Sequence, residues 1–228
     1  TLNKLTAITA LSKQGNSFRL IDRDCAKLFK KEIYLLSNLP VNHGRPRSYA
    51  GRKRQILCIG YFSFVKNQIK ALKVLKLLPT DFEMVFVGNK EGAYYKSTIA
   101  FIDQNKLWDR VKIYQDNEVK LSELYEQVLV VMSSSITEVL SLVLLESMAT
   151  GTPFVATSVG VNSQLSGGFI SNSNRKMADF IVQLADSESL WNLYSKRCLD
   201  EVNKNHSNDI ITKQMNDMVE SVLSMDKG

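Results

Sequence analysis

Two glutamates, Glu138 and Glu146, lie eight residues apart around the start of a predicted helix. Eight helical steps of about 100° leave an offset of about 80°, so a helix preceded by an extended loop could aim both carboxylates at one cleft. The helix start at Ser141 and Leu142 also offers unpaired N–H groups that suit an anion. The alternative is a buried amphipathic helix on which Glu146 simply reaches solvent.

A second group of residues follows an apolar run that ends at Gly60. A glycine there lets a ligand approach the backbone, and Lys66, followed by Asn67, adds a positive charge at the start of the next helix. This pattern suits a phosphate, although an ordinary turn with a solvated lysine is the alternative. Together the two groups suit a nucleotide sugar, because the diphosphate takes the lysine and N–H groups while the carboxylates accept hydrogen bonds from hydroxyls.

The elements that must position these residues are short apolar strands alternating with helices. Such a pattern predicts βαβ units and a doubly wound parallel α/β sheet, whose ligand crevice lies outside the carboxyl ends of the strands. The predicted strands are residues 55–60, 83–88, 111–114, 128–132, 154–157 and 168–171, and the predicted helices between them are 66–78, 93–106, 121–126 and 142–150. The crevice is therefore expected beyond Gly60, Gly88, Tyr114 and Ser133.

The two ends of the chain are organised differently. Residues 175–223 are expected to form three helices, and the last of them carries an apolar face of Ile211, Met215, Met218 and Val222. Residues 1–43 are predicted to be one more βαβ piece, with strands at 6–11 and 32–36 and a helix at 17–29. Two strands are too few for an independent sheet. We therefore expect 1–43 to belong to another domain, 44–54 to be a basic linker and 55–228 to be the C-terminal domain.

The composition narrows the function further. The 228 residues are 44% hydrophobic and 23% charged, as in a soluble globular chain, and no apolar run is long enough to span a bilayer. The net charge is 29 − 23 = +6, which fits an anionic partner, but the basic residues lack the aromatic interleaving typical of nucleic-acid binding. Three scattered cysteines and two histidines argue against a disulfide framework or a zinc site, and for a reducing compartment.

Several of these motifs resemble those of the family-4 retaining glycosyltransferases of GT-B fold. The resemblance covers about residues 50–225, which would be the complete C-terminal, Rossmann-like, donor-binding domain, and residues 33–41 look like the segment that closes the N-terminal, acceptor-side domain. The residues that carry it are Gly60, Lys66-Asn67, Ser135-x-x-Glu138, Leu144-Leu145-Glu146-Ser147-Met148-Ala149-x-Gly151-Thr152-Pro153-Phe154-Val155-Ala156-Thr157 and Val159-Gly160.

The resemblance implies a role for each site residue. Lys66 would contact the donor diphosphate and Glu138 would bond the transferred sugar, so these two are the catalytic candidates. Glu146 would hold the ribose hydroxyls, and the amides of Ser141 and Leu142 would cap the phosphate. The remaining donor-binding candidates are Gly60, Tyr61, Asn67, Gly88, Tyr114 and Gln115, of which Gly88, Tyr114 and Gln115 would face the base. The family works without a metal, so no metal site and no cofactor are expected.

The sequence also departs from the family pattern. Tyr61 stands where the family usually has arginine, so half of the cationic clamp is missing. The family's Glu-Gly-Phe-Gly reads Glu138-Val139-Leu140-Ser141, which adds side chains where the backbone should approach phosphate. The usual Gly-Gly after the next strand is Gly160-Val161. These changes keep a second hypothesis open, a degenerate non-catalytic partner subunit, and a sugar-nucleotide epimerase is a third.

The first hypothesis is a retaining, metal-independent glycosyltransferase of polysaccharide biosynthesis. It would move a hexosyl unit from a UDP- or GDP-linked sugar onto a carbohydrate or lipid-linked acceptor. This chain would supply the donor-binding half and would be inactive without the rest of the N-terminal domain, which is missing or on another chain. We expect a cytoplasmic protein in which the basic stretch at 45–54 is a solvated linker. The alternative is that this stretch contacts the anionic inner membrane face or a lipid-diphosphate acceptor.

Overall fold

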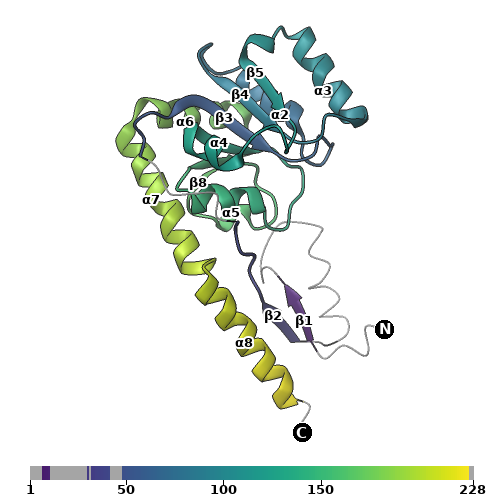
Figure 1. Ribbon diagram of the computed structural model, residues 1–228, viewed down its shortest axis with the longest axis vertical. Coiled ribbons are helices and arrows are strands. Elements are labelled where there is room, and N and C mark those ends of the chain that lie inside the picture. Colours follow the sequence, from purple (N-terminus) through teal and green to yellow (C-terminus); the bar gives the residue numbers. More distant parts are fainter. Residues whose placement is uncertain (1–6, 11–29, 31, 42–47, 226–228) are drawn as a thin grey trace.

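The computed structural model describes residues 7–10, 30, 32–41 and 48–225. These residues form two units, a large α/β unit and a small one built on two strands (Figure 1). The large unit contains a six-stranded, wholly parallel sheet in the order β5-β4-β3-β6-β7-β8. Its strands are β3 (Lys53–Ile59), β4 (Glu83–Val87), β5 (Val111–Tyr114), β6 (Val128–Ser133), β7 (Phe154–Ala156) and β8 (Gly168–Ile170).

Helices cover both faces of this sheet, as expected for a doubly wound fold. The helices are α2 (Gln68–Leu75), α3 (Gly92–Gln104), α4 (Leu121–Gln127), α5 (Leu142–Ala149), α6 (Asn174–Asp186), α7 (Glu188–Asn205) and α8 (Asn208–Met225), with 3-10 turns η2 (Trp108–Arg110) and η3 (Asn162–Gln164). Successive β3 side chains point to opposite faces. Ile56 and Cys58 therefore join the core under α2, α3 and α6, whereas Leu57 joins the core under α4 and α5.

The strands and helices agree closely with the sequence predictions. The strand at 111–114 has the predicted bounds, and the other strands of the large sheet differ from the prediction by one or two residues at an end. The predicted edge strand is β8, which lies at one end of the sheet. Helix α2 is shorter than expected, since it begins at Gln68 and ends at Leu75 instead of spanning 66–78. The doubly wound parallel α/β fold is thus confirmed.

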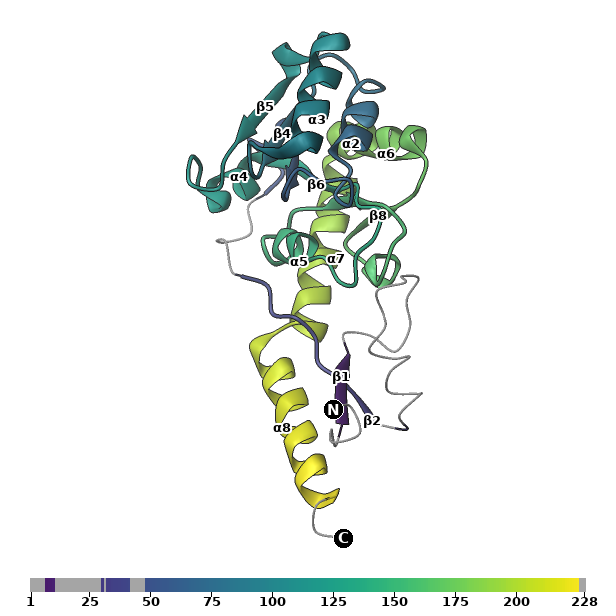
Figure 2. The same cartoon turned by 90° about the vertical axis from the view of Figure 1, so that its right-hand side faces the viewer.

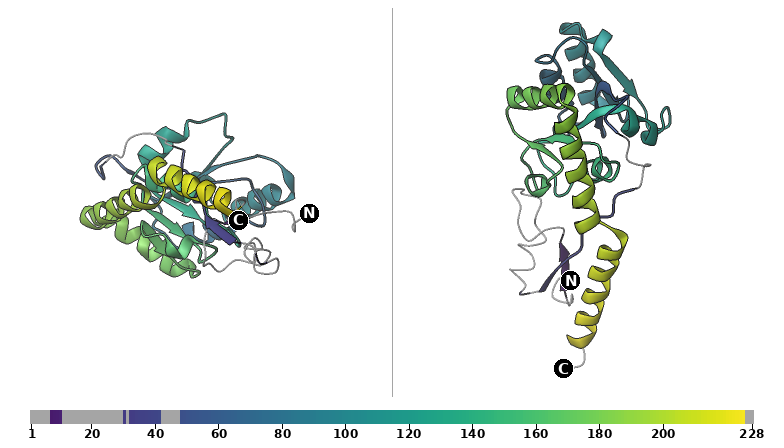
Figure 3. Two further views of the ribbon diagram at one scale, coloured as in Figure 1. Left: turned by 90° about the horizontal axis from the view of Figure 1, so that it is seen from below. Right: turned by 90° about the vertical axis from the view of Figure 1, so that its left-hand side faces the viewer.

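The small unit pairs β1 (Ala7–Ala10) with β2 (Glu32–Leu35) in parallel. Both predicted strands are present, and the helix expected at 17–29 lies outside the described residues. Helix α8 continues beyond α7 away from the large sheet and reaches this unit (Figures 2 and 3). Polar contacts join them: the Tyr34 hydroxyl lies 2.6 Å from Ser221 Oγ, and the Ser37 amide donates to Gln214 Oε1 over 3.1 Å.

The apolar face expected on the last helix is wrong at one position. Ile211, Met218 and Val222 are half-buried, but Met215 is exposed. The helix contacts β2 and the segment after it through Gln214 and Ser221, which lie on a face rotated away from Met215. The spacing of apolar residues does not predict these polar contacts, and they shift the packed face of the helix away from Met215.

Arg52, the last residue before β3, is bound within the large unit. Its Nη1 donates to the carbonyls of Tyr125 and Val128 over 2.8 and 2.9 Å and to Thr152 Oγ1 over 3.0 Å. The guanidinium lies 4.5 Å from the centroid of the Trp191 ring. Arg52 therefore fixes the entry to the first strand. Contact of the basic stretch with a membrane stays a prediction, and residues 45–47 lie outside the described part.

Candidate nucleotide-sugar site

The loop after β3 and the loop after β6 meet at the carboxyl edge of the sheet, where the crevice was expected. The Ser134 hydroxyl lies 2.9 Å from the carbonyl oxygens of both Lys66 and Asn67. The Ile136 amide donates to the Val65 carbonyl over 2.8 Å. The two groups of residues singled out in the sequence are therefore brought together by direct backbone and hydroxyl contacts.

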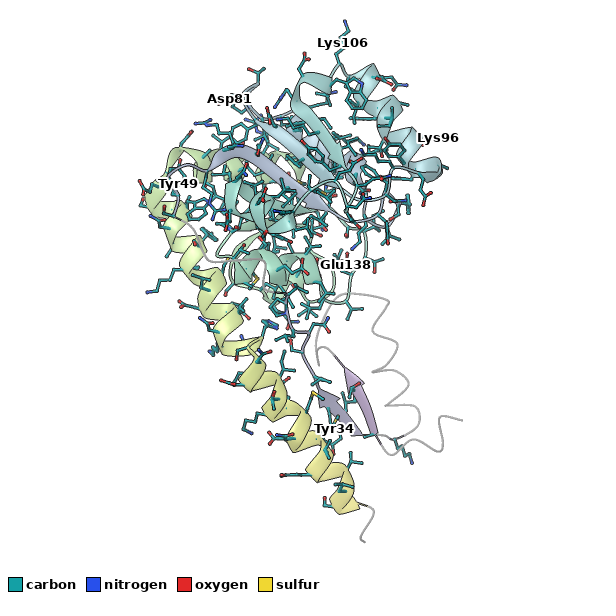
Figure 4. The ribbon with its side chains drawn as sticks, viewed as in Figure 1. Tyr34, Tyr49, Asp81, Lys96, Lys106 and Glu138 are labelled. Atoms are coloured by element: carbon teal, nitrogen blue, oxygen red, sulfur yellow. The ribbon has the colours of Figure 1, made fainter. Side chains whose placement is uncertain are left out.

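Lys66 and Glu138 form an ion pair between these loops, with 2.5 Å between Nζ and Oε1. Ser135 Oγ donates to the same carboxylate oxygen over 2.9 Å. The Lys66 side chain is 32% exposed and that of Glu138 is 15% exposed, so solvent reaches the pair mainly from the lysine side. Glu138 lies on the side of the large unit that faces the β1–β2 sheet (Figure 4).

Two glycines let the ends of neighbouring strands come close beneath this pair. A Cβ at Gly88 would lie 2.4 Å from the Gly60 carbonyl oxygen, so only glycine fits there. Gly60 has a φ of +141°, and the side-chain carbons of Lys66 lie 3.4–3.5 Å from the position of a Cβ. The Gly60 amide donates to the Val87 carbonyl, and the Gly88 amide to the Tyr114 carbonyl, each over 2.9 Å. Lys66 thus reaches the site by passing over Gly60.

Gly160 supports the loop between β6 and α5 from behind. Its φ is +55°, and a Cβ would lie 2.2 Å from the Glu138 carbonyl oxygen and 2.5 Å from that of Val139. The Val161 amide donates to the Val139 carbonyl over 2.8 Å, and the Thr157 hydroxyl donates to the Ser135 carbonyl in the same loop over 2.6 Å. The loop that carries Glu138 is therefore held in place by residues 157–161, the segment that follows β7.

Glu146 lies in the second turn of α5, half-buried. The Tyr125 hydroxyl donates to its Oε2 over 3.1 Å. The Tyr125 side chain is fully buried, and burial, with a further contribution from the Glu146 charge, raises its pKa well above the usual value. Tyr125 is not predicted from the sequence, because nothing in the short helix at 121–127 indicates that its hydroxyl reaches a glutamate 21 residues later.

The amino end of α5 adjoins the Lys66 side of the site. Ser141 is the N-cap, and its side chain does not bond the helix amides, which leaves first-turn N–H groups without a partner inside the helix. Ser141 and Lys66 line one narrow cavity of about 10 Å³, together with Cys58, Ile59, Met132, Ser133, Ser134, Ser135 and Val143. A space of this size holds about one water molecule. A phosphate must therefore sit outside it or displace the Lys66–Glu138 pair.

A larger pocket of about 350 Å³ opens beyond β4 and β5. It includes three predicted residues, Tyr61, Gly88 and Gln115, and its other lining residues are Asn89, Lys90, Glu91, Asp116 and Asn117. Tyr61 is exposed at 68%, so its ring is available to a ligand. The Gln115 backbone N–H donates to Glu118 Oε2 over 2.8 Å. The pKa of Glu118 is lowered mainly by Lys90 and, to a smaller extent, by this bond.

Three other predicted residues have different surroundings. Asn67 has a left-handed φ of 51° at the start of α2, and its Oδ1 accepts a bond from the Tyr94 hydroxyl over 3.3 Å. Tyr114 is half-buried at the end of β5, and Leu142 is exposed. The Asn67 side chain is therefore engaged within the fold, whereas Leu142 faces solvent at the start of α5.

The described part of the chain has no group of three or more histidine, cysteine, aspartate or glutamate side chains placed to hold a metal ion. Within the same residues, no helix is both long enough and apolar enough to cross a membrane.

His206 is buried, and its Nδ1 lies 2.6 Å from Ser37 Oγ, so it joins α7 to the small unit.

Comparison with known proteins gives one family and many similar folds. The profile of the family described as glycosyl transferases group 1 matches residues 45–171. No curated protein sequence matches the chain. A TarM variant from S. aureus, solved with fondaparinux, α-GlcNAc-glycerol and UDP, is 19% identical, with a TM-score of 0.79 over 95% of this chain and 44% of its own.

Two further solved structures are similar. HepE of Anabaena, solved with UDP-glucose, is 16% identical, with a TM-score of 0.78 over 96% of this chain and 65% of its own. A sucrose-phosphate synthase from Thermosynechococcus elongatus is 18% identical, with a TM-score of 0.79 over 98% of this chain and 60% of its own. The chain thus spans less than two thirds of each of these three structures. Its large unit has the Rossmann-like fold of GT-B glycosyltransferases.

Proposed function

The chain belongs to the glycosyl transferases of group 1, and on that premise we propose that it binds a nucleoside diphosphate sugar at the carboxyl edge of its large sheet. The sugar, a hexosyl unit, passes to a carbohydrate or lipid-linked acceptor with retention of configuration and without a metal. UDP is the favoured carrier, because TarM and HepE are solved with UDP or UDP-glucose and share this fold.

The observation that carries the proposal is the meeting of Lys66, Glu138 and Ser135 beside the amino end of α5. In the proposed complex the lysine ammonium and the first-turn amides of α5 neutralise the charge that develops on the leaving diphosphate. Glu138 turns to the transferred sugar and accepts its hydroxyl bonds. Because cation and carboxylate start in contact, a small rearrangement is enough to separate their two roles.

The rest of the donor extends along the edge of the sheet. Glu146 accepts bonds from the ribose hydroxyls, and the pocket lined by Tyr61, Gly88 and Gln115 takes the base. The small β1–β2 unit is, in this proposal, the end of the acceptor-side domain. Since the chain spans less than two thirds of the structures it matches, we expect it to bind donor but not to turn over alone. We place it in the cytoplasm, peripheral to the membrane.

A calorimetric titration of the 228-residue chain with UDP, and separately with GDP, tests the proposal. We expect saturable binding of one of them, weakened by Glu146→Ala and unchanged by Glu123→Ala, a matched loss of an exposed carboxylate on α4. Equal affinities in wild type and Glu146→Ala would contradict the role given to Glu146. Adding the acceptor-side domain and a UDP-sugar should then yield glycosylated acceptor.

A specific observation favours a second candidate, a non-catalytic partner subunit. Tyr61, at the place where the family usually has arginine, presents a phenol instead of a cation beside the base pocket. Val139 and Ser141 add side chains to the loop next to the phosphate position. The same titration separates the two candidates, because a partner subunit would bind neither UDP nor GDP up to millimolar concentration.

A further inference from the structure

We propose that Tyr125 is a positioning residue for the donor, because its hydroxyl holds the Glu146 carboxylate in the orientation that receives the two ribose hydroxyls. This inference rests on the proposed function, in which Glu146 binds the ribose. Tyr125 lies in α4, which precedes β6 in the chain, whereas the loop that carries Glu138 follows β6. The sequence motifs of the site do not include Tyr125.

The contact itself restricts the carboxylate. The Tyr125 hydroxyl donates to Glu146 Oε2 over 3.1 Å, and the phenol ring is fully buried in the core between the sheet and α5. A ring packed in this way cannot swing aside, so the hydroxyl is a fixed donor. Glu146 is only half-buried, so a fixed donor on its carboxylate restricts the orientation in which it meets a ligand.

The backbone of Tyr125 is held from the opposite side. Its carbonyl accepts bonds from Arg52 Nη1 over 2.8 Å and from Thr152 Oγ1 over 3.1 Å. Arg52 in turn stacks 4.5 Å from the Trp191 ring centroid. A continuous set of contacts therefore runs from the start of the large unit through Tyr125 to Glu146, and both ends of the tyrosine are fixed.

The direction of the hydrogen bond follows from the burial of the phenol. Burial and the neighbouring Glu146 charge both raise the pKa of Tyr125 well above its usual value, so the hydroxyl keeps its proton at neutral pH. The phenol is then the donor and the carboxylate the acceptor.

Tyr125→Phe removes the hydroxyl and keeps the ring, so it tests the inference with little change in packing. We expect the Kd for UDP, measured by calorimetry on the full chain, to rise about 3- to 10-fold, the usual worth of one hydrogen bond. The Kd for 2′,3′-dideoxy-UDP, which lacks both ribose hydroxyls, should not change. Tyr49→Phe is the matched control: it loses a hydroxyl bonded to the distant Ala185 carbonyl and should bind both nucleotides as wild type does.

The outcomes separate this inference from the proposed function. If Tyr125→Phe weakens UDP and the dideoxy analogue equally, or weakens neither while Glu146→Ala weakens UDP, the positioning role is overturned and the site stands. If Glu146→Ala has no effect, the proposed function fails and this inference with it. Should Tyr125→Phe not fold, Arg52→Lys, which loosens the backbone anchor, is expected to give the same ribose-selective loss, and an equal loss for both nucleotides would overturn it.

Discussion

The ion pair between Lys66 and Glu138 leads to a counterintuitive prediction for donor binding. A diphosphate that binds Lys66 must compete with the Glu138 carboxylate, which also repels it. Glu138→Gln keeps the size and hydrogen-bonding ability of the side chain but removes its charge. We therefore expect this variant to bind UDP more tightly than wild type, although it loses a proposed catalytic group.

The size of the effect follows from the geometry of the pair. Unit charges 2.5 Å apart, the distance between Lys66 Nζ and Glu138 Oε1, attract by ~1.7 kcal/mol in water. Measured exposed pairs retain ~0.2–1 kcal/mol after the side chains are ordered. Since the Glu138 side chain is only 15% exposed, the upper end of that range applies. About 1 kcal/mol corresponds to a Kd for UDP about 5-fold lower in the variant.

Calorimetry with UDP at low and high salt measures this change. The gain should shrink at high salt, because ions screen the partly exposed pair. Ser135→Ala is the control: it removes the hydroxyl bonded to Glu138 but keeps the charge, so its gain should be much smaller. A Kd that is unchanged or higher in Glu138→Gln would refute the competition between carboxylate and diphosphate, whatever its effect on transfer.

Three further predictions concern the phosphate contact and the stability of the fold. Lys66→Ala should weaken UDP binding by ~1.5–3 kcal/mol, the worth of a charged hydrogen bond. Lys73→Ala, which removes an exposed lysine on the following helix α2, should not weaken it, and calorimetry measures both. Gly160→Ala should lower Tm by roughly 5–10 °C, because it combines a left-handed φ with a backbone clash, and Gly92→Ala, with open space around it, by less than half as much. Burial lowers the pKa of His206 below 6.5, so the unfolded chain takes up the proton first and the stability of the fold decreases as pH drops below about 6.5. In thermal melts, the Tm of His206→Asn should therefore decrease less than that of wild type over this pH range, and an identical pH profile would exclude this linkage.

Much of the fold could be predicted because the local signals are strong. Apolar runs that end in glycine, such as those ending at Gly60 and Gly88, mark buried parallel strands, and parallel strands present their carboxyl ends at one edge. This rule was enough to bring Lys66 and Glu138 together, although they are 72 residues apart in the chain. The pairing of the two loops was therefore accessible to sequence reasoning.

The contacts that could not be predicted depend on tertiary packing of polar groups. Arg52 was interpreted as part of a solvated linker, yet it donates to carbonyls 73 and 76 residues away and to Thr152. Tyr125 was not singled out, because its hydroxyl has a partner only once α4 and α5 lie on the same face of the sheet. Periodicity predicts which face of a helix is buried, but it does not predict which polar atom meets which.

The departures from the family pattern acquire a physical meaning when they are compared with the glycines that remain. Glycine is present at positions 60, 88 and 160, where backbone segments are in close contact. A Cβ at position 88 or 160 would lie 2.4 Å or less from a carbonyl oxygen. Side chains replace glycine at Val139 and Ser141, where the loop lies against the proposed phosphate position. The glycines that frame the site are retained. The substitutions at Val139 and Ser141 lie beside the proposed phosphate position, whereas Tyr61 lines the pocket proposed for the base. A chain of this kind is expected to keep its preference for ribose and base while it binds the diphosphate less tightly, so the affinity ratio of UDP to uridine is the quantity that reports what the substitutions changed.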